Sequence, residues 1–261
     1  MQPRNPRKTV KRKRSAEKPA YPVPGEVGGR LARRLVKAVR EAGLAPPLAS
    51  HILCACSGGA DSVALAVLLA RYGRRVGTRI TLLHVNHGWR GKESDGDEAF
   101  VKRLAARLGA GFVAHRLTEK PGAGESWEAH ARSLRKAAFR EASEARGGAL
   151  VFTAHSADDQ AETRLWRIFT GAFDELGRGI LPRHGVEVRP LLDVRRAELR
   201  TFLREERQRW REDPTNADSR FLRAKMRQEL MPVIERIFPR AIDAINRLDP
   251  ARASRKMQNF S

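Results

Sequence analysis

The sequence predicts an α/β fold, an open parallel sheet with helices on both faces, followed by a short helical C-terminal segment. Short apolar runs alternate with amphipathic helical stretches between residues 51 and 170, a pattern typical of βαβ units. A glycine-rich turn joins the first apolar run to the first helical stretch at residues 57–62. Polar side chains gather where the predicted strands end, the edge at which parallel sheets bind ligands.

The composition indicates a folded protein outside the membrane. The chain has 261 residues, enough for one large or two small domains, and 41% of them are hydrophobic. No apolar run approaches the roughly 20 residues of a membrane span, and the N-terminus lacks a signal-peptide pattern. Cys54 and Cys56 share one face of a predicted strand, which favours buried small hydrophobes over a disulfide or zinc pair. We therefore expect a cytoplasmic protein without a membrane partner.

The net charge of +21 predicts a polyanionic partner. About half of this excess lies in residues 1–40, which contain 13 Lys or Arg and 2 Glu. A solvated basic tail is the alternative interpretation of that segment. The aromatic content of 6% argues against an extended platform for stacking single strands.

The order of predicted elements divides the chain into three parts. Residues 1–25 are rich in Pro, Lys and Arg and predict a disordered basic tail. A catalytic domain is expected at 26–185, opening with a helix whose apolar face carries Leu31, Leu35, Val36 and Val39. Residues 186–261 form a C-terminal extension of that domain with basic helices.

Within these parts, periodicity predicts each element. Predicted strands cover 51–56, 79–85, 111–117 and 149–154, with a short strand at 186–189. Predicted helices cover 62–72, 94–108, 126–146, 159–170 and about 195–207.

The turn Ser57-Gly58-Gly59-Ala60-Asp61-Ser62 is the most informative stretch of the sequence. Its glycines permit positive φ and close approach, and the following helix N-terminus presents free backbone N–H groups. This predicts a phosphate site. Asp61 beside it predicts an intervening Mg²⁺ or ligand donor, since a carboxylate alone would repel phosphate. A simple helix cap is the alternative, which would account for one Ser or Asp but not for the whole set.

Three acids follow the fourth predicted strand. Asp159 and Glu162 are spaced to project together from the first turn of a helix, with Asp158 beside them. Capping is one interpretation, because carboxylates there are favoured by the helix dipole. The others are holding Mg²⁺, holding the ammonium of an amine substrate, or acting as a base.

Arginines recur on two predicted helices. Arg132 and Arg135 share a face of the third helix, where a solvated face is the alternative. Arg220, Arg223 and Arg227 form a row on a helix near the C-terminus that suits phosphate contacts.

Several of these motifs carry a family resemblance. The turn resembles the pyrophosphate loop of N-type ATP pyrophosphatases, the PP-loop superfamily, which implies an adenine nucleotide alpha hydrolase-like fold. His84-Val85-Asn86-His87-Gly88-Trp89-Arg90, the stretch around Arg132 and Arg135, the acids at 158–162 and the basic helix resemble tRNA(Ile)-lysidine synthetases in the same order. Ser156 stands where that family has a second His.

The resemblance implies a reaction and its participants. Such enzymes use ATP and Mg²⁺ to adenylate the wobble cytidine of a CAU-anticodon tRNA(Ile), and free L-lysine then displaces AMP to give lysidine. The implied catalytic residues are Asp61, Arg132, Asp159 and Glu162, and Asp61 and Asp158 are the implied Mg²⁺ ligands. The implied ATP-binding residues are Ser57, Gly58, Gly59, Ala60, Asp61, Ser62, His84 and Asn86, and the implied tRNA-binding residues are Arg90, Arg135, Arg220, Arg223 and Arg227.

Alternatives stay open at this point. A tRNA sulfur transferase usually needs a reactive Cys outside the loop, an amidotransferase-type synthetase needs a glutaminase region, and an inactive RNA-binding relic needs neither. Family members usually continue beyond the position of Pro232 into tRNA-gripping domains, so we expect either a reduced grip helped by the basic tail or a truncated gene. The oligomeric state is open, a homodimer included.

Overall fold

The computed structural model describes residues 25–41, 51–86, 88, 91–117, 119, 121–122, 126–172, 179–212 and 222–247. The predicted basic tail lies almost entirely outside these ranges, as do Arg90 and Arg220. None of the described helices is long and apolar enough to cross a membrane.

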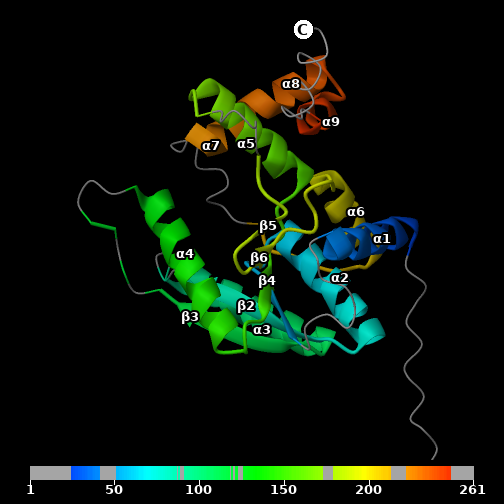
Figure 1. Cartoon of the computed structure of the whole chain (residues 1–261), viewed down its shortest axis with the longest axis vertical. Helices are drawn as coiled ribbons and strands as arrows, with labels where there is room; N and C mark the ends of the chain where they lie inside the picture. The colour runs from blue at the N-terminus through cyan, green and yellow to red at the C-terminus, as the bar shows by residue number, and fades with distance from the viewer. Residues whose placement is uncertain are drawn as a thin grey trace, which may run out of the picture.

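A six-stranded sheet organises the molecule, with strand order β3-β2-β1-β4-β6-β5 (Figure 1). The strands are β1 (His51–Ala55), β2 (Arg79–Asn86), β3 (Gly111–Arg116), β4 (Leu150–Phe152), β5 (Arg183–His184) and β6 (Glu187–Val188). The pairs β1–β2, β1–β4, β2–β3 and β4–β6 are parallel, which confirms the predicted sheet. The sheet is mixed rather than wholly parallel, because β5 runs antiparallel to β6 at the edge. Gly185, with φ +58°, allows the tight turn between those two short strands.

Helices cover both faces of the sheet, as predicted. The helices α1 (Glu26–Glu41), α2 (Ala60–Val76), α3 (Lys92–Leu108) and α6 (Arg196–Glu205) share one core with Ile52 and Cys54. The helix α4 (Trp127–Glu144) packs on the opposite face, where Leu53 points because side chains alternate along β1. The buried apolar side chains of α1 are those of Leu31, Leu35 and Val39, with Val36 partly buried, which confirms the predicted apolar face.

The remaining helices form a separate group at one end of the molecule. They are α5 (Ala157–Phe169), α7 (Leu222–Lys225), the π-helical turn η2 (Met226–Leu230), α8 (Met231–Ile237) and α9 (Ala241–Asn246). Ala157 and Ala161 of α5 pack with Met231 and Ile242 in a small core of their own. Figure 1 shows this group beyond the carboxyl ends of the strands. The elements β6 and α6, which follow residue 185, share the sheet and main core with the earlier elements. The predicted division of the chain at residue 185 stays a prediction.

Candidate active site

The glycine turn is held open by hydrogen bonds within itself. Gly58 has φ +98°, a backbone conformation that residues with a side chain rarely adopt. The Ser57 hydroxyl accepts the Gly59 N–H at 3.3 Å, and the Ser62 hydroxyl donates to the Gly59 carbonyl at 2.9 Å. Neighbouring segments hold it from outside, since the Arg211 N–H donates to the Gly58 carbonyl at 2.9 Å.

Above this turn, the N-terminus of α2 can receive an anion. The first intrahelical bond of α2 is that of the Val63 N–H with the Gly59 carbonyl, at 3.0 Å. The N–H groups of residues 60–62 therefore have no intrahelical acceptor, and they form the positive end of the dipole of this 17-residue helix. This geometry suits the phosphate site that the sequence predicts.

Two of the predicted ATP-binding residues make structural hydrogen bonds at the end of β2, and one of them, His84, contacts the residue before the turn. The buried His84 ring donates from Nδ1 to the Cys56 carbonyl at 2.9 Å. The buried Asn86 amide donates to Glu98 at 2.8 Å and its oxygen accepts the Gly88 N–H at 2.9 Å. These bonds give both residues a structural task, and their direct contact with ATP stays a prediction.

The acid pair of α5 lies at the carboxyl end of β4. Ser156 caps the helix in a capping box, in which its hydroxyl accepts the Asp159 N–H at 3.3 Å and its own N–H donates to Asp159 Oδ2 at 2.8 Å. The Ser156 hydroxyl also donates to that oxygen at 2.9 Å. The other oxygen, Oδ1, receives the Arg227 guanidinium at 3.0 Å. Glu162 is buried and receives the same guanidinium at 2.8 Å. Asp159 and Glu162 thus face a common centre, and Asp159 is a cap as well.

One arginine joins this pair to the glycine turn. The Arg196 guanidinium donates to Glu162 at 2.6 Å and to Asp159, and its Nε lies 3.5 Å from Asp61. We refer to Asp61, Asp159 and Glu162 as the acid centre. It brings together residues predicted from two separate motifs, at the ends of β1 and β4.

Asp158 holds that arginine in place. It accepts the Arg196 backbone N–H at 2.8 Å, at the start of α6, and the Arg195 side chain at 3.3 Å. Arg195 in turn pairs with Glu235 of α8. The oxygens of Asp158 are therefore engaged by protein donors, and its predicted role as a Mg²⁺ ligand stays a prediction.

Burial and neighbouring charges shift the pKa values of residues at the acid centre. Burial raises the pKa of Asp61 to about 6, and the nearby Arg196 opposes this only in part. Burial would also raise the pKa of Asp159, but Arg196, the Ser156 N–H and Arg227 hold that pKa below its usual value. Burial lowers the pKa of His155, at the end of β4, to about 4, so the ring is neutral at pH 7.

The arginines predicted from the sequence lie in different places in the structure. Arg227 lies in the acid centre, and its contact with tRNA stays a prediction. Arg132 is exposed on α4, and no ion pair described for the acid centre involves it. Arg135, one turn later, lies close enough to His155 to depress its pKa. The side chain of Arg223 lies outside the described residues.

Sequence reasoning missed Arg195 and Arg196. The signal available was an Arg pair directly before a helix and after Pro190-Leu191-Leu192. In a chain with 51 Lys and Arg such a pair does not stand out. Only the fold reveals that it meets the acids of α5.

A magnesium site built from protein ligands alone is absent from the described ranges, which contain no group of three His, Cys, Asp or Glu suited to a metal. Mg²⁺ usually takes one or two carboxylates together with substrate phosphates. Asp61, partly exposed beside the phosphate site, fits that arrangement.

The cysteines sit beneath the turn and are inert. Cys54 and Cys56 are both buried, as predicted, and burial raises the pKa of Cys56 to about 11. A thiol with that pKa is almost wholly protonated at neutral pH and is a poor nucleophile or metal ligand.

Comparisons with known proteins identify the family of this chain. Residues 30–234 match a family model described as "PP-loop domain". A tRNA(Ile)-lysidine synthase of Thermus thermophilus is 42% identical over 205 residues, covering 77% of this chain and 39% of that relative. Those of Rhodopirellula baltica (37%) and Chlorobaculum tepidum (38%) cover 75% and 72% of this chain, which spans 55% and 57% of them.

Among solved structures, the chain is similar to the U34-tRNA thiolase NcsA from Methanococcus maripaludis with its [4Fe-4S] cluster. The TM-score is 0.69 with 15% identity, covering 84% of this chain and 76% of that one. At this identity the likeness shows a common fold.

Proposed function

Because this chain belongs to the PP-loop domain family, we propose that it uses ATP to ligate L-lysine to the wobble cytidine of a CAU-anticodon tRNA(Ile). The cytidine O2 attacks the α-phosphate of ATP and pyrophosphate leaves. The lysine amine then attacks C2, a proton is lost, and AMP leaves with the O2 atom. The products are lysidine, AMP and pyrophosphate. A cytoplasmic location, where ATP and tRNA meet, is part of the proposal.

The observation that carries this proposal is the acid centre beside the phosphate site. Two guanidinium groups, Arg196 and Arg227, face its three carboxylates and leave one negative charge uncompensated. A single ammonium group supplies the positive charge that would compensate it, and the buried surroundings strengthen the attraction. An amine substrate therefore matches the centre in charge and in position.

Each part of the site has a defined task in this proposal. The N–H groups of residues 60–62 stabilise the departing pyrophosphate. Asp61 would hold Mg²⁺ together with the ATP phosphates, whose negative charge exceeds that of the metal, so the excess carboxylate of the acid centre still favours an ammonium group. Asp159 and Glu162 would orient the lysine ammonium and accept its proton, since only the neutral amine is a nucleophile.

The arginines outside the centre complete the proposal. We assign Arg132 and Arg223 to nucleotide or phosphate contacts. We also assign Arg223, together with Arg90, Arg135, Arg220 and Arg227, to the tRNA, with the basic N-terminal tail as a further electrostatic contact.

Thiolation, the activity in the name of the structural neighbour, is not favoured. The chain has two cysteines, Cys54 and Cys56, and both are buried in β1 or directly after it. Neither can reach the acid centre as a thiolate or supply a cluster.

The proposal is tested by incorporation of labelled L-lysine into total tRNA with ATP and Mg²⁺. We expect label in a CAU-anticodon tRNA, lost in Asp61→Ala, Asp159→Ala and Glu162→Ala. Asp193→Ala is the matched control, because that carboxylate is exposed and lies 3.9 Å from Arg34, outside the site. If the wild-type chain bound tRNA but incorporated no lysine, an inactive RNA-binding protein or another modification would replace this proposal.

A further inference from the structure

A stripe of side chains on α5 leads away from the acid centre. Asp159, Glu162, Trp166 and Phe169 are spaced by three, four and three residues, so they share one face of the helix. From the first to the last of them the axis advances by about 15 Å. The stripe changes from acidic to aromatic along this length.

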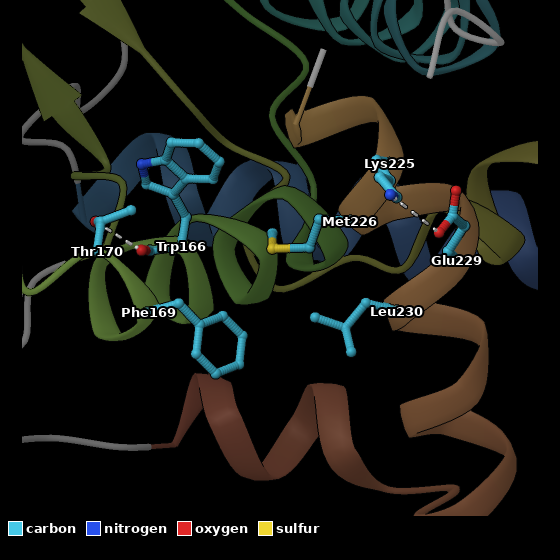
Figure 2. Close-up of a pocket in the computed structure, with 7 residues that line it drawn as sticks. All are labelled: Trp166, Phe169, Thr170, Lys225, Met226, Glu229 and Leu230. Carbon is cyan, nitrogen blue, oxygen red and sulfur yellow. Dashed lines mark hydrogen bonds and ion pairs between the residues drawn. The ribbon is translucent and has the colours of Figure 1, made fainter. Parts of the chain in front are cut away.

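A pocket of about 280 Å³ opens at the aromatic end of the stripe. Trp166 and Phe169 line it from α5, and Met226 and Leu230 line it from η2 (Figure 2). Lys225 and Glu229 stand at its border, 4.0 Å apart. Thr170 completes the lining, and we call these seven residues the aromatic pocket. Its volume is near the lower limit for ligand sites, about 300 Å³, so it suits one ring system.

Both walls of the aromatic pocket are continuous with the acid centre. On α5, Trp166 follows Glu162 by one helical turn, about 6 Å along the axis. On the opposite wall, Met226 precedes Arg227, whose guanidinium contacts Asp159 and Glu162. A π-helical turn carries Met226 and Arg227, and such turns are frequent at functional sites.

The aromatic surface of the pocket is open to a ligand. Phe169 is 63% exposed, which is high for a Phe that lines a hollow. An exposed aromatic face beside a cationic side chain is the combination that proteins use to hold an unstacked base and its phosphate. The low aromatic content of the chain argues against an extended stacking platform, but not against a pocket for one base.

We propose that the aromatic pocket binds a nucleobase of the RNA substrate, that of a nucleotide next to the wobble cytidine. This inference rests on the proposed function, which places the wobble base at the acid centre. The base would stack on Phe169 and Trp166, and its phosphate would compete with Glu229 for Lys225, whose 4.0 Å ion pair is solvent-exposed and therefore weak. Residues 222–247, which form the helices beside the pocket, carry six Lys or Arg and three Asp or Glu, and this local positive charge favours an RNA strand over a protein segment of ordinary charge. Because stacking is tolerant of base identity, this contact adds affinity and position rather than sequence choice.

The test uses a CAU-anticodon stem-loop RNA and two versions that lack the base immediately 5′ or 3′ of the wobble cytidine. Dissociation constants are measured at one fixed salt concentration. We expect Phe169→Ala to weaken binding of the intact stem-loop about tenfold. Ile168→Ala is the matched control, because Ile168 is the adjacent exposed apolar residue, at 43%, and lies off the stripe. It should change binding less than about twofold.

The coupling between protein and base decides the outcome. One of the two base-deleted RNAs should bind wild type about tenfold more weakly, and Phe169→Ala should weaken that RNA no further. Equal loss by Phe169→Ala on all three RNAs would overturn the proposal in favour of a protein segment packed on the pocket. No loss on any RNA would also overturn it.

The two proposals fail in different ways. Coupling without lysine incorporation would leave the pocket standing and remove the ligase function. Lysine incorporation without coupling would leave the ligase function standing and remove the pocket.

Discussion

Arg196 is the residue whose removal the structure makes most informative. Its guanidinium contacts three carboxylates, of which the Glu162 side chain is only 3% exposed, and the Arg196 side chain is itself 20% exposed. In Arg196→Ala these acids keep only the Arg227 guanidinium, at 3.0 Å from Asp159 and 2.8 Å from Glu162. Two negative charges of three would then be uncompensated.

The expected loss follows from that geometry. Removing one partner of a buried ion pair typically costs 3–5 kcal/mol, because the other charge is left unpaired. Arg227 keeps its contacts and Arg196 is partly exposed, so we expect the lower end, about 3 kcal/mol in the free energy of unfolding. Arg200→Ala, one turn further along α6, is the control. Its side chain is 48% exposed and lies 3.9 Å from Glu212, so its loss should be under about 1 kcal/mol.

The loss of unfolding free energy in Arg196→Ala should depend on pH in a defined direction. The pKa of Asp159 is held below its usual value in the folded protein, so Asp159 stabilises the fold above the usual Asp pKa and loses this effect as the pH falls. Arg196 is a main cause of that shift. The loss of unfolding free energy in Arg196→Ala should therefore be full at pH 7.5 and should narrow below the usual Asp pKa of about 4, at pH 3. Urea unfolding at both values measures it, and a deficit equal to that of Arg200→Ala, or constant with pH, would refute the reasoning.

Three further predictions concern the surroundings of this arginine. Gly58→Ala forces a side chain into φ +98° and should cost about 1–3 kcal/mol in stability and weaken ATP binding, measured by calorimetry. Because burial raises the pKa of Asp61 to about 6, affinity for MgATP should fall as the pH drops through 6, and the affinity of Asp61→Asn should be weak and independent of pH across that range. Asp158→Asn loses the charged acceptor for Arg195 and the Arg196 N–H, and should destabilise by about 1–3 kcal/mol in urea unfolding.

Most of the fold could be predicted because periodicity depends on burial. Apolar runs located β1 to β4 within a few residues, since β1, β2 and β4 are buried on both faces and the edge strand β3 is partly buried. Helices start earlier than predicted, at Ala60 rather than 62 and at Ala157 rather than 159. Their first turns hold small and acidic residues that the helix dipole favours, and an apolar pattern does not register these. The two-residue strand β5 is too short for periodicity to detect.

The C-terminal arginines show a different limit. The predicted row at positions 220, 223 and 227 assumed a continuous α-helical period. The structure has a π-helical turn at Met226–Leu230, which changes the angular step where Arg227 lies. Arg227 reaches the acid centre from this turn. A local insertion of this kind leaves no mark in an amphipathic pattern.

Asp159 shows why a sequence could suggest the residues of the site but not their hydrogen-bond partners. Capping and chemistry were opposed interpretations of Asp159, yet the structure divides them between its two oxygens. Oδ2 accepts the Ser156 N–H at 2.8 Å, and Oδ1 accepts Arg227 at 3.0 Å. An alanine substitution removes both, so lost activity in Asp159→Ala would not by itself assign a catalytic role. Asp159→Asn keeps an acceptor for the cap and removes the charge, and it is the change that separates the two.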